Sequence, residues 1–230
     1  MAFVFEIPIL LEICGKFACP PEVQSVAAEN LAPSVFINTL QQGKKSLEAV
    51  QSLARMMPDE KSVEWAVGSA KMGGAVAGLS DEEMKALDAA LDWAENQGTE
   101  AQTAAFNAAQ ELSPSSPSYW AANAAAFAQP ATELPAAPEL AAMAGDASSH
   151  FAAGAVLLAA GQAATGASAE IPQMAMDVPI PQGAVAQAMG EAAVPEVAAM
   201  TPKQLEETAK LLEPFIKKGL EIAETVPGWS

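Results

Sequence analysis

The chain has 230 residues, and its 28 Asp and Glu against 11 Lys and Arg give a formal net charge of −17 at pH 7. A surface this acidic repels phosphate backbones and anionic lipid headgroups, which argues against nucleic acid and membrane insertion as modes of interaction. Much of the hydrophobic content is alanine, the strongest helix former, whereas β-branched residues are sparse. The composition therefore predicts an all-α fold of closely packed helices.

Prolines divide the N-terminal part of the chain into short predicted helices. The first covers residues 9–17, and Pro21 and Pro33 each open another, because proline is tolerated at the first position of a helix. A further helix begins near Leu47, follows an i, i+3, i+7 apolar pattern and ends at Pro58. Short helices with short connections favour antiparallel packing, so we expect an array of helical hairpins.

The next two predicted helices have clearer signals. The helix that carries Trp65 is expected to fade at Gly73 and Gly74, because glycine weakens a helix interior. Ser80 and Glu83 have the spacing of a capping box, in which each side chain bonds the other residue's backbone N–H. This box starts a helix whose expected buried stripe is Met84, Leu87, Leu91 and Ala94.

Two more helices are predicted before residue 128. A second, weaker capping box spans residues 99–102, and Ser116 with Pro117 begins a helix that carries Trp120. Three tryptophans thus lie on three separate predicted helices, at Trp65, Trp93 and Trp120. We interpret them as packing anchors of the core rather than as the lining of a binding pocket.

The sequence after residue 128 predicts a different organisation of the chain. The expected units are a helical-hairpin domain (1–128), a Pro/Ala linker (129–147), a helix packing on the domain (148–164), a flexible Ala/Met/Pro insert (165–200), and a C-terminal helix with its tail (201–230). Thr201 and Pro202 combine a cap with a first-turn proline, and Pro214 should kink the amphipathic helix that follows.

The sequence shows no catalytic, metal or cofactor motif. The single histidine, His150, lies at a predicted helix start and is interpreted as capped or solvated. Cys14 and Cys19 are too few for a zinc site or a disulfide scaffold and read as small apolar residues. The acidic pairs, such as Asp59 with Glu60, fall in first helical turns, where carboxylates stabilise the helix dipole. We therefore expect no catalytic residue, no metal and no cofactor.

The C-terminal helix offers the sharpest binding hypothesis. Its apolar stripe and the tail tryptophan are the expected partner-binding residues: Leu205, Leu212, Phe215, Ile216, Leu220 and Trp229. Because Trp229 follows a Pro-Gly break, two alternatives remain open: it docks into the chain's own core, or it serves as a handle for a partner.

Several segments resemble an uncharacterised bacterial family of alanine-rich helical proteins. The matching motifs, in chain order, are Ser62–Ala70, Leu79–Glu83, Ala86–Ala94, Ser116–Ala122, Ala152–Ala160 and Phe215–Ala223. The resemblance covers most of residues 8–160 and 210–223, and the insert at 165–200 departs from it. It carries no established activity, but it implies a setting, since genes of this family often lie among type VI secretion genes.

Together these features predict a non-catalytic, cytoplasmic adaptor, scaffold or chaperone-like component. Its partner would be another protein, such as a secretion component or an effector, bound in grooves between helices. Two alternatives stay open. A structural subunit would form a stable homo-oligomer, and an enzyme with an unrecognised carboxylate site would hold an Asp or Glu of raised pKa in a pocket.

Overall fold

The computed structural model describes residues 9–29, 31–128, 146–165 and 201–229. These residues form ten helices and no strand, so the predicted all-α class is confirmed. The helices are α1 (Leu10–Cys14), α2 (Pro21–Ala27), α3 (Pro33–Gln42), α4 (Ser46–Met56), α5 (Asp59–Ala77), α6 (Asp81–Asn96), α7 (Thr99–Ala109), α8 (Pro117–Ala126), α10 (Ala147–Thr165) and α11 (Pro202–Ala223). Most of the predicted linker (129–147) and nearly all of the insert (165–200) lie outside the described residues.

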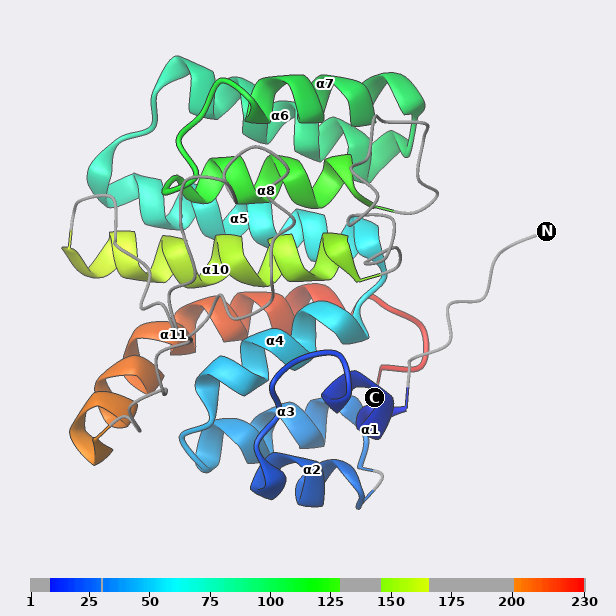
Figure 1. The fold of residues 1–230 in the computed structure, drawn as a ribbon, viewed down its shortest axis with the longest axis vertical. Helices are drawn as coiled ribbons and strands as arrows, with labels where there is room; N and C mark the ends of the chain where they lie inside the picture. Colours follow the sequence, from blue (N-terminus) through cyan, green and yellow to red (C-terminus); the bar gives the residue numbers. More distant parts are fainter. Residues whose placement is uncertain (1–8, 30, 129–145, 166–200, 230) are drawn as a thin grey trace, which may run out of the picture.

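The helices are stacked in layers along the long axis of the molecule. In Figure 1, α6 and α7 lie at the top, α8, α5 and α10 follow, then α11 and α4, and finally α3, α1 and α2 at the bottom. Two large clusters of buried side chains and a small one of four alanines fill this stack. The upper core is built by α5 to α8 with one face of α10, and the lower core by α1 to α4, α11 and Trp65 of α5 with the other face of α10.

The central position of α10 follows from its composition. This helix consists largely of alanine and is apolar all round, so it has no solvent face and is suited to burial. Phe151 and Leu158 enter the upper core, whereas Val156 and Ala160 enter the lower core. The sequence predicted this helix at 148–164 as an element packed on the domain, but the structure places it between the two cores.

Glycine allows α10 to approach its neighbours closely. A Cβ atom at Gly73 of α5 would lie 2.6 Å from the carbonyl oxygen of Ala159, and one at Gly154 would clash with the ring of Trp120. This explains an error of the sequence analysis: α5 does not fade at Gly73 and Gly74 but continues to Ala77. Tight packing against α10 compensates here for the low helix propensity of glycine.

The capping predictions hold at α6 and α11 and fail at α7. Both bonds of the Ser80–Glu83 box are present, and Thr201 forms a second box with Gln204. No side chain caps α7, because its N-cap is Gly98 and Thr99 is already the first helical residue. Gln102 is buried, and its amide donates a 2.9 Å hydrogen bond to the carbonyl of Ala128.

The predicted stripe of α6 is also partly wrong. Leu87 is buried as predicted, but Met84 is 37% exposed and Leu91 and Ala94 are only half-buried. The helix buries Ala86, Ala90 and Trp93 in their place. Trp65, Trp93 and Trp120 are all buried, which confirms their interpretation as core anchors.

Candidate functional site

The C-terminal helix α11 lies against α4, α5 and α10 and near the end of α3. Among the expected partner-binding residues, Leu212, Phe215, Ile216 and Trp229 are buried in the lower core, and Leu205 and Leu220 are half-buried. The surface that these side chains would offer to another protein is therefore occupied by the chain itself. Their role in binding stays a prediction, and it requires α11 to leave its place.

We call the surface of α4, α5 and α10 beneath α11 the α11 seat. Two contacts fix the position of α11 in this seat. The indole N–H of Trp65 donates a 2.8 Å hydrogen bond to the backbone carbonyl of Phe215. One helical turn later, a Cβ atom at Gly219 would lie 2.6 Å from Trp65 Cε2 and 2.7 Å from Leu53 Cδ2. The seat therefore accepts only a very small residue at this point.

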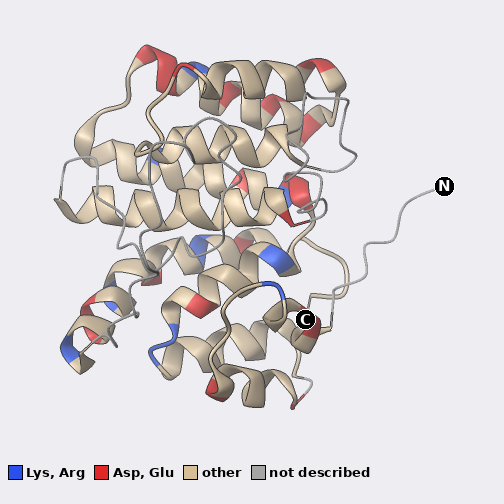
Figure 2. Ribbon diagram, in the orientation of Figure 1, with Lys and Arg blue, Asp and Glu red and all other residues tan. Residues whose placement is uncertain are grey.

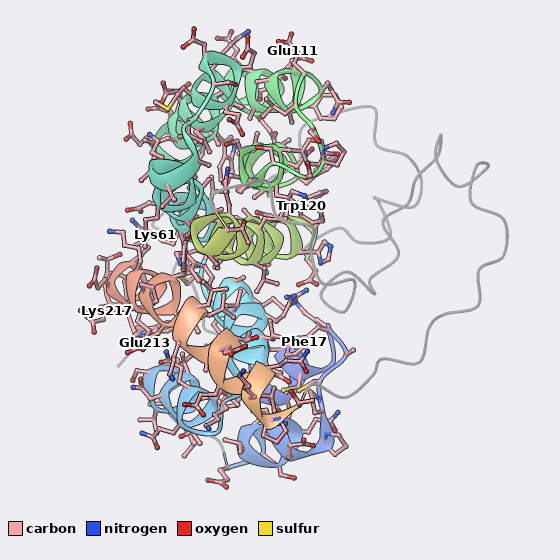
Figure 3. The ribbon with its side chains drawn as sticks, turned by 90° about the vertical axis from the view of Figure 1, so that its left-hand side faces the viewer. Phe17, Lys61, Glu111, Trp120, Glu213 and Lys217 are labelled. Carbon is pink, nitrogen blue, oxygen red and sulfur yellow. The ribbon has the colours of Figure 1, made fainter. Side chains whose placement is uncertain are left out.

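The helix continues through Pro214 from Pro202 to Ala223. Its two halves run in different directions in Figures 1 and 3, and the bend lies close to Glu213 and Lys217, as the kink prediction required. The second half lies in the seat. None of the first nine residues is buried, so the first half contributes little to the core.

The tail after α11 folds back into the lower core. Trp229 is 2% exposed, which answers the question that the sequence left open in favour of docking in the chain's own core. Its indole nitrogen is buried and has no hydrogen-bond partner in the described part of the chain. Trp65 and Trp120, by contrast, each donate to a backbone carbonyl.

Exposed ion pairs surround the first half of α11. Glu206 lies 3.4 Å from Lys44 Nζ and 3.0 Å from Lys210 Nζ. These lysines lower the pKa of Glu206 below its ordinary value, first through the bond from Lys210 and then through Lys44. All three side chains are about half exposed or more, so solvent screens these pairs and they contribute little stability.

A second group of polar residues lies where α4 meets the start of α10. The buried guanidinium of Arg55 has its Nε 3.1 Å from Asp146 Oδ1, and its Nη1 donates to Gln51. The ring of Phe17 covers the same guanidinium at 5.4 Å. Burial raises the pKa of Asp146 even though Arg55 opposes this shift, and Arg55 Nη2 has no partner among the described residues.

His150 lies one turn into α10 from Asp146 and was interpreted incorrectly from the sequence. It is neither solvated nor capping but 3% exposed, with its ring 5.9 Å from that of Trp120. Burial, with a smaller contribution from the charge of Arg55, lowers its pKa to about 4. The imidazole is therefore neutral at pH 7, and neither ring nitrogen has a hydrogen-bond partner within the described ranges. No sequence signal marked His150 as buried, because the apolar residues of α10 show no helical periodicity.

The two cysteines lie at the end of α1 and in the turn after it. Both are free, Cys14 buried and Cys19 half-buried. Burial, followed by the proximity of Cys14, raises the pKa of the Cys19 thiol well above its ordinary value. The thiol is therefore protonated at pH 7 and is a poor nucleophile.

Charge is unevenly distributed over the molecule. Residues 79–128, which form the upper layer, contain eight Asp and Glu but a single Lys. Figure 2 shows the acidic positions of α6 and α7 with little blue among them, whereas the basic positions gather around α3, α4 and α11.

Over the residues described, no group of three or more His, Cys, Asp and Glu is placed to hold a metal ion. Within the same ranges, no helix has both the length and the apolar character needed to cross a bilayer.

Comparison with known protein families gives a match over residues 36–175 to a model described as a family of unknown function, DUF6931. The matched range includes the helices that form the α11 seat and stops before α11 itself. No curated protein matches the chain, and no solved structure does so either.

Proposed function

Because the chain belongs to the DUF6931 family, whose match ends before α11, we propose that it is a non-catalytic protein-binding adaptor or scaffold that uses α11 and its seat. One observation carries this proposal. A helix outside the family unit lies in a shaped seat on that unit, held by the glycine contact and the Trp65 bond. An amphipathic helix in an apolar groove is a common way in which proteins recognise each other.

The partner that we propose is a protein, either a secretion component or an effector, in a type VI secretion setting within the cytoplasm. The net charge of −17 supports a protein over nucleic acid, because it opposes any polyanion. The start of α11 supports contact at this end, since most of residues 202–210 are exposed and adjoin the buried stripe of the same helix.

Site-specific photo-crosslinking in the native organism tests this proposal. A crosslinking amino acid replaces Glu213 or Lys217, which are exposed on α11, and Glu111 serves as the control (Figure 3). We expect one defined protein to be captured from both α11 positions and not from the control. Capture of only a second copy of this chain would instead support the self-assembling subunit, and equal capture at all three positions would contradict both.

A second candidate function, an enzyme that uses a carboxylate, has one observation in its favour. The pKa of Asp146 is raised, and the residue lies beside Arg55 and near His150. Asp146→Asn keeps the shape of this group and removes its acid–base chemistry. A change in the metabolites of cells carrying Asp146→Asn, without loss of the folded protein, would favour the enzyme over the adaptor.

A further inference from the structure

We propose that the α11 seat is an exchange site, in which an amphipathic helix of the partner replaces the chain's own α11. This inference rests on the proposed adaptor function and specifies how the contact is made. The seat recognises features that any suitable helix can supply, and α11 occupies it with visible defects.

The seat recognises general helical features at its two fixed points. The Trp65 indole bonds a backbone carbonyl, which every helix possesses, rather than a particular side chain of α11. The notch between Trp65 and Leu53 requires only that the residue facing it be glycine, as Gly219 is. A helix from another protein can satisfy both requirements.

The buried positions of α11 define the pattern that such a helix must have. Counted from Leu212, they recur at intervals of three and four residues, with the small residue at the fourth place: Leu212, Phe215, Ile216, Gly219, Ile222 and Ala223. This is the anchor spacing of a helix that lies in a groove. The partner segment is therefore a helix with three large apolar residues followed by Gly at these intervals.

The chain's own segment fills the site imperfectly. Docking of the tail buries the indole N–H of Trp229 without an acceptor among the described residues, so this polar group loses its bond to water on docking. Residues 202–210 of α11 add no buried side chain, and their link to the end of α3 is the exposed pair of Lys44 and Glu206. A helix of the same pattern without these defects would compete favourably with α11.

The test uses the full chain and a fluorescently labelled peptide that corresponds to residues 202–229 as the probe. The peptide competes with the chain's own α11, so it should bind the unaltered chain weakly in fluorescence anisotropy. Gly219→Ala or Trp229→Ala in the chain weakens only its own helix, because the peptide keeps both residues and the seat is unchanged. We expect each variant to bind the peptide at least about tenfold more tightly, as expected for overpacking or for loss of a large buried side chain.

Matched controls separate this effect from general loosening. Gly98→Ala in the chain should not change peptide binding, because a Cβ atom there meets nothing within 4 Å. A peptide with Gly219→Ala should lose at least about tenfold in affinity, whereas one with Glu213→Ala, at an exposed position, should bind unchanged. The proposal is overturned if folded Trp229→Ala protein binds no peptide, or if the Gly219→Ala peptide binds as well as the unaltered one. If crosslinking still identifies a partner in that event, the adaptor function stands and only the exchange fails.

Discussion

Arg55 of α4 and Asp146, the residue before α10, form an ion pair with Nε 3.1 Å from Oδ1 across 91 residues of sequence. The pair joins the lower half of the molecule to its central helix, and 1% of the Arg55 side chain and 23% of the Asp146 side chain are exposed. Two charges removed from water in this way depend on each other, since either alone is left without compensation.

Arg55→Ala should therefore destabilise the protein strongly. We expect the free energy of unfolding to fall by about 3 kcal/mol. This is the lower end of the range for breaking a buried ion pair, because Asp146 is partly exposed. Denaturation in urea measures this loss, and the double variant Arg55→Ala/Asp146→Ala should lose less than the sum of the single variants. Lys203→Ala, which removes a surface pair with Glu207, is the control and should lose less than about 0.5 kcal/mol. Equal effects of Arg55→Ala and Lys203→Ala would contradict this account of the ion pair.

Two glycines of the same helix should respond in opposite directions to alanine. At Gly73 the added Cβ would lie 2.6 Å from the backbone of Ala159, so Gly73→Ala should cost about 1–3 kcal/mol through overpacking. At Gly68 the nearest atom is Lys218 Cε at 3.9 Å, so Gly68→Ala should stabilise by up to about 1 kcal/mol through helix propensity. Thermal unfolding of the two variants checks the pair, and a rise in Tm for Gly73→Ala would show that α5 and α10 can separate at no cost.

Buried, neutral His150 should make stability depend on pH. Its pKa is about 4 in the folded protein and near 6.5 when unfolded, so the unfolded state binds the proton first as the pH falls. The stabilisation is complete above about pH 6.5 and is lost progressively toward pH 4, by about 3 kcal/mol in total.

The variant His150→Phe isolates this contribution. Unfolding free energies of both proteins are measured from pH 8 to pH 4.5, and the difference between them is compared at each pH. The raised pKa of Asp146 contributes with the opposite sign, because its ionisation is disfavoured in the folded state, but this contribution is common to both proteins. A difference that does not change with pH would show that His150 is charged or solvated in the folded protein.

Glu83 accepts hydrogen bonds at the starts of two helices. Its Oε2 accepts from the backbone of Ser80 in the capping box of α6, and its Oε1 accepts a 2.6 Å hydrogen bond from the hydroxyl of Ser116, the N-cap of α8. We expect Glu83→Ala to cost about 1–2 kcal/mol, more than Ser116→Ala, because it removes both bonds. Glu95→Ala, at an exposed position of the same helix, is the control in urea denaturation. If the two glutamate variants lose equal stability, neither bond of Glu83 contributes to stability.

Local rules predicted the elements better than their arrangement. The boxes at Ser80 and Thr201 and the prolines at Pro21 and Pro33 act within a few residues, so the sequence alone places these helix starts correctly. Gly73 shows the limit, because glycine both ends helices and allows them to touch, and only the tertiary structure decides between the two roles.

The candidate site was predicted only in part, because local rules do not show which distant residues meet. The amphipathic stripe of α11 was visible as periodicity, but its seat is assembled from residues far apart, such as Leu53 and Trp65. Asp146 fell inside the predicted linker, and α10 gave no periodicity that could mark His150 as buried. Composition identified α10 as a helix but did not reveal that its side chains pack into two cores.

The division of α10 between two cores has a consequence for biosynthesis. The ribosome releases α1 to α8 before α10, so the faces of α4, α5 and α8 that α10 covers remain exposed to solvent until residue 165 has emerged. Neither core can close earlier, because Phe151 belongs to one and Val156 to the other, and the lower core also needs α11. A nascent chain stalled at residue 128 should therefore bind chaperones and be sensitive to proteases along its whole length. The upper region should become protected once α10 is available, and the lower region only after α11 has followed.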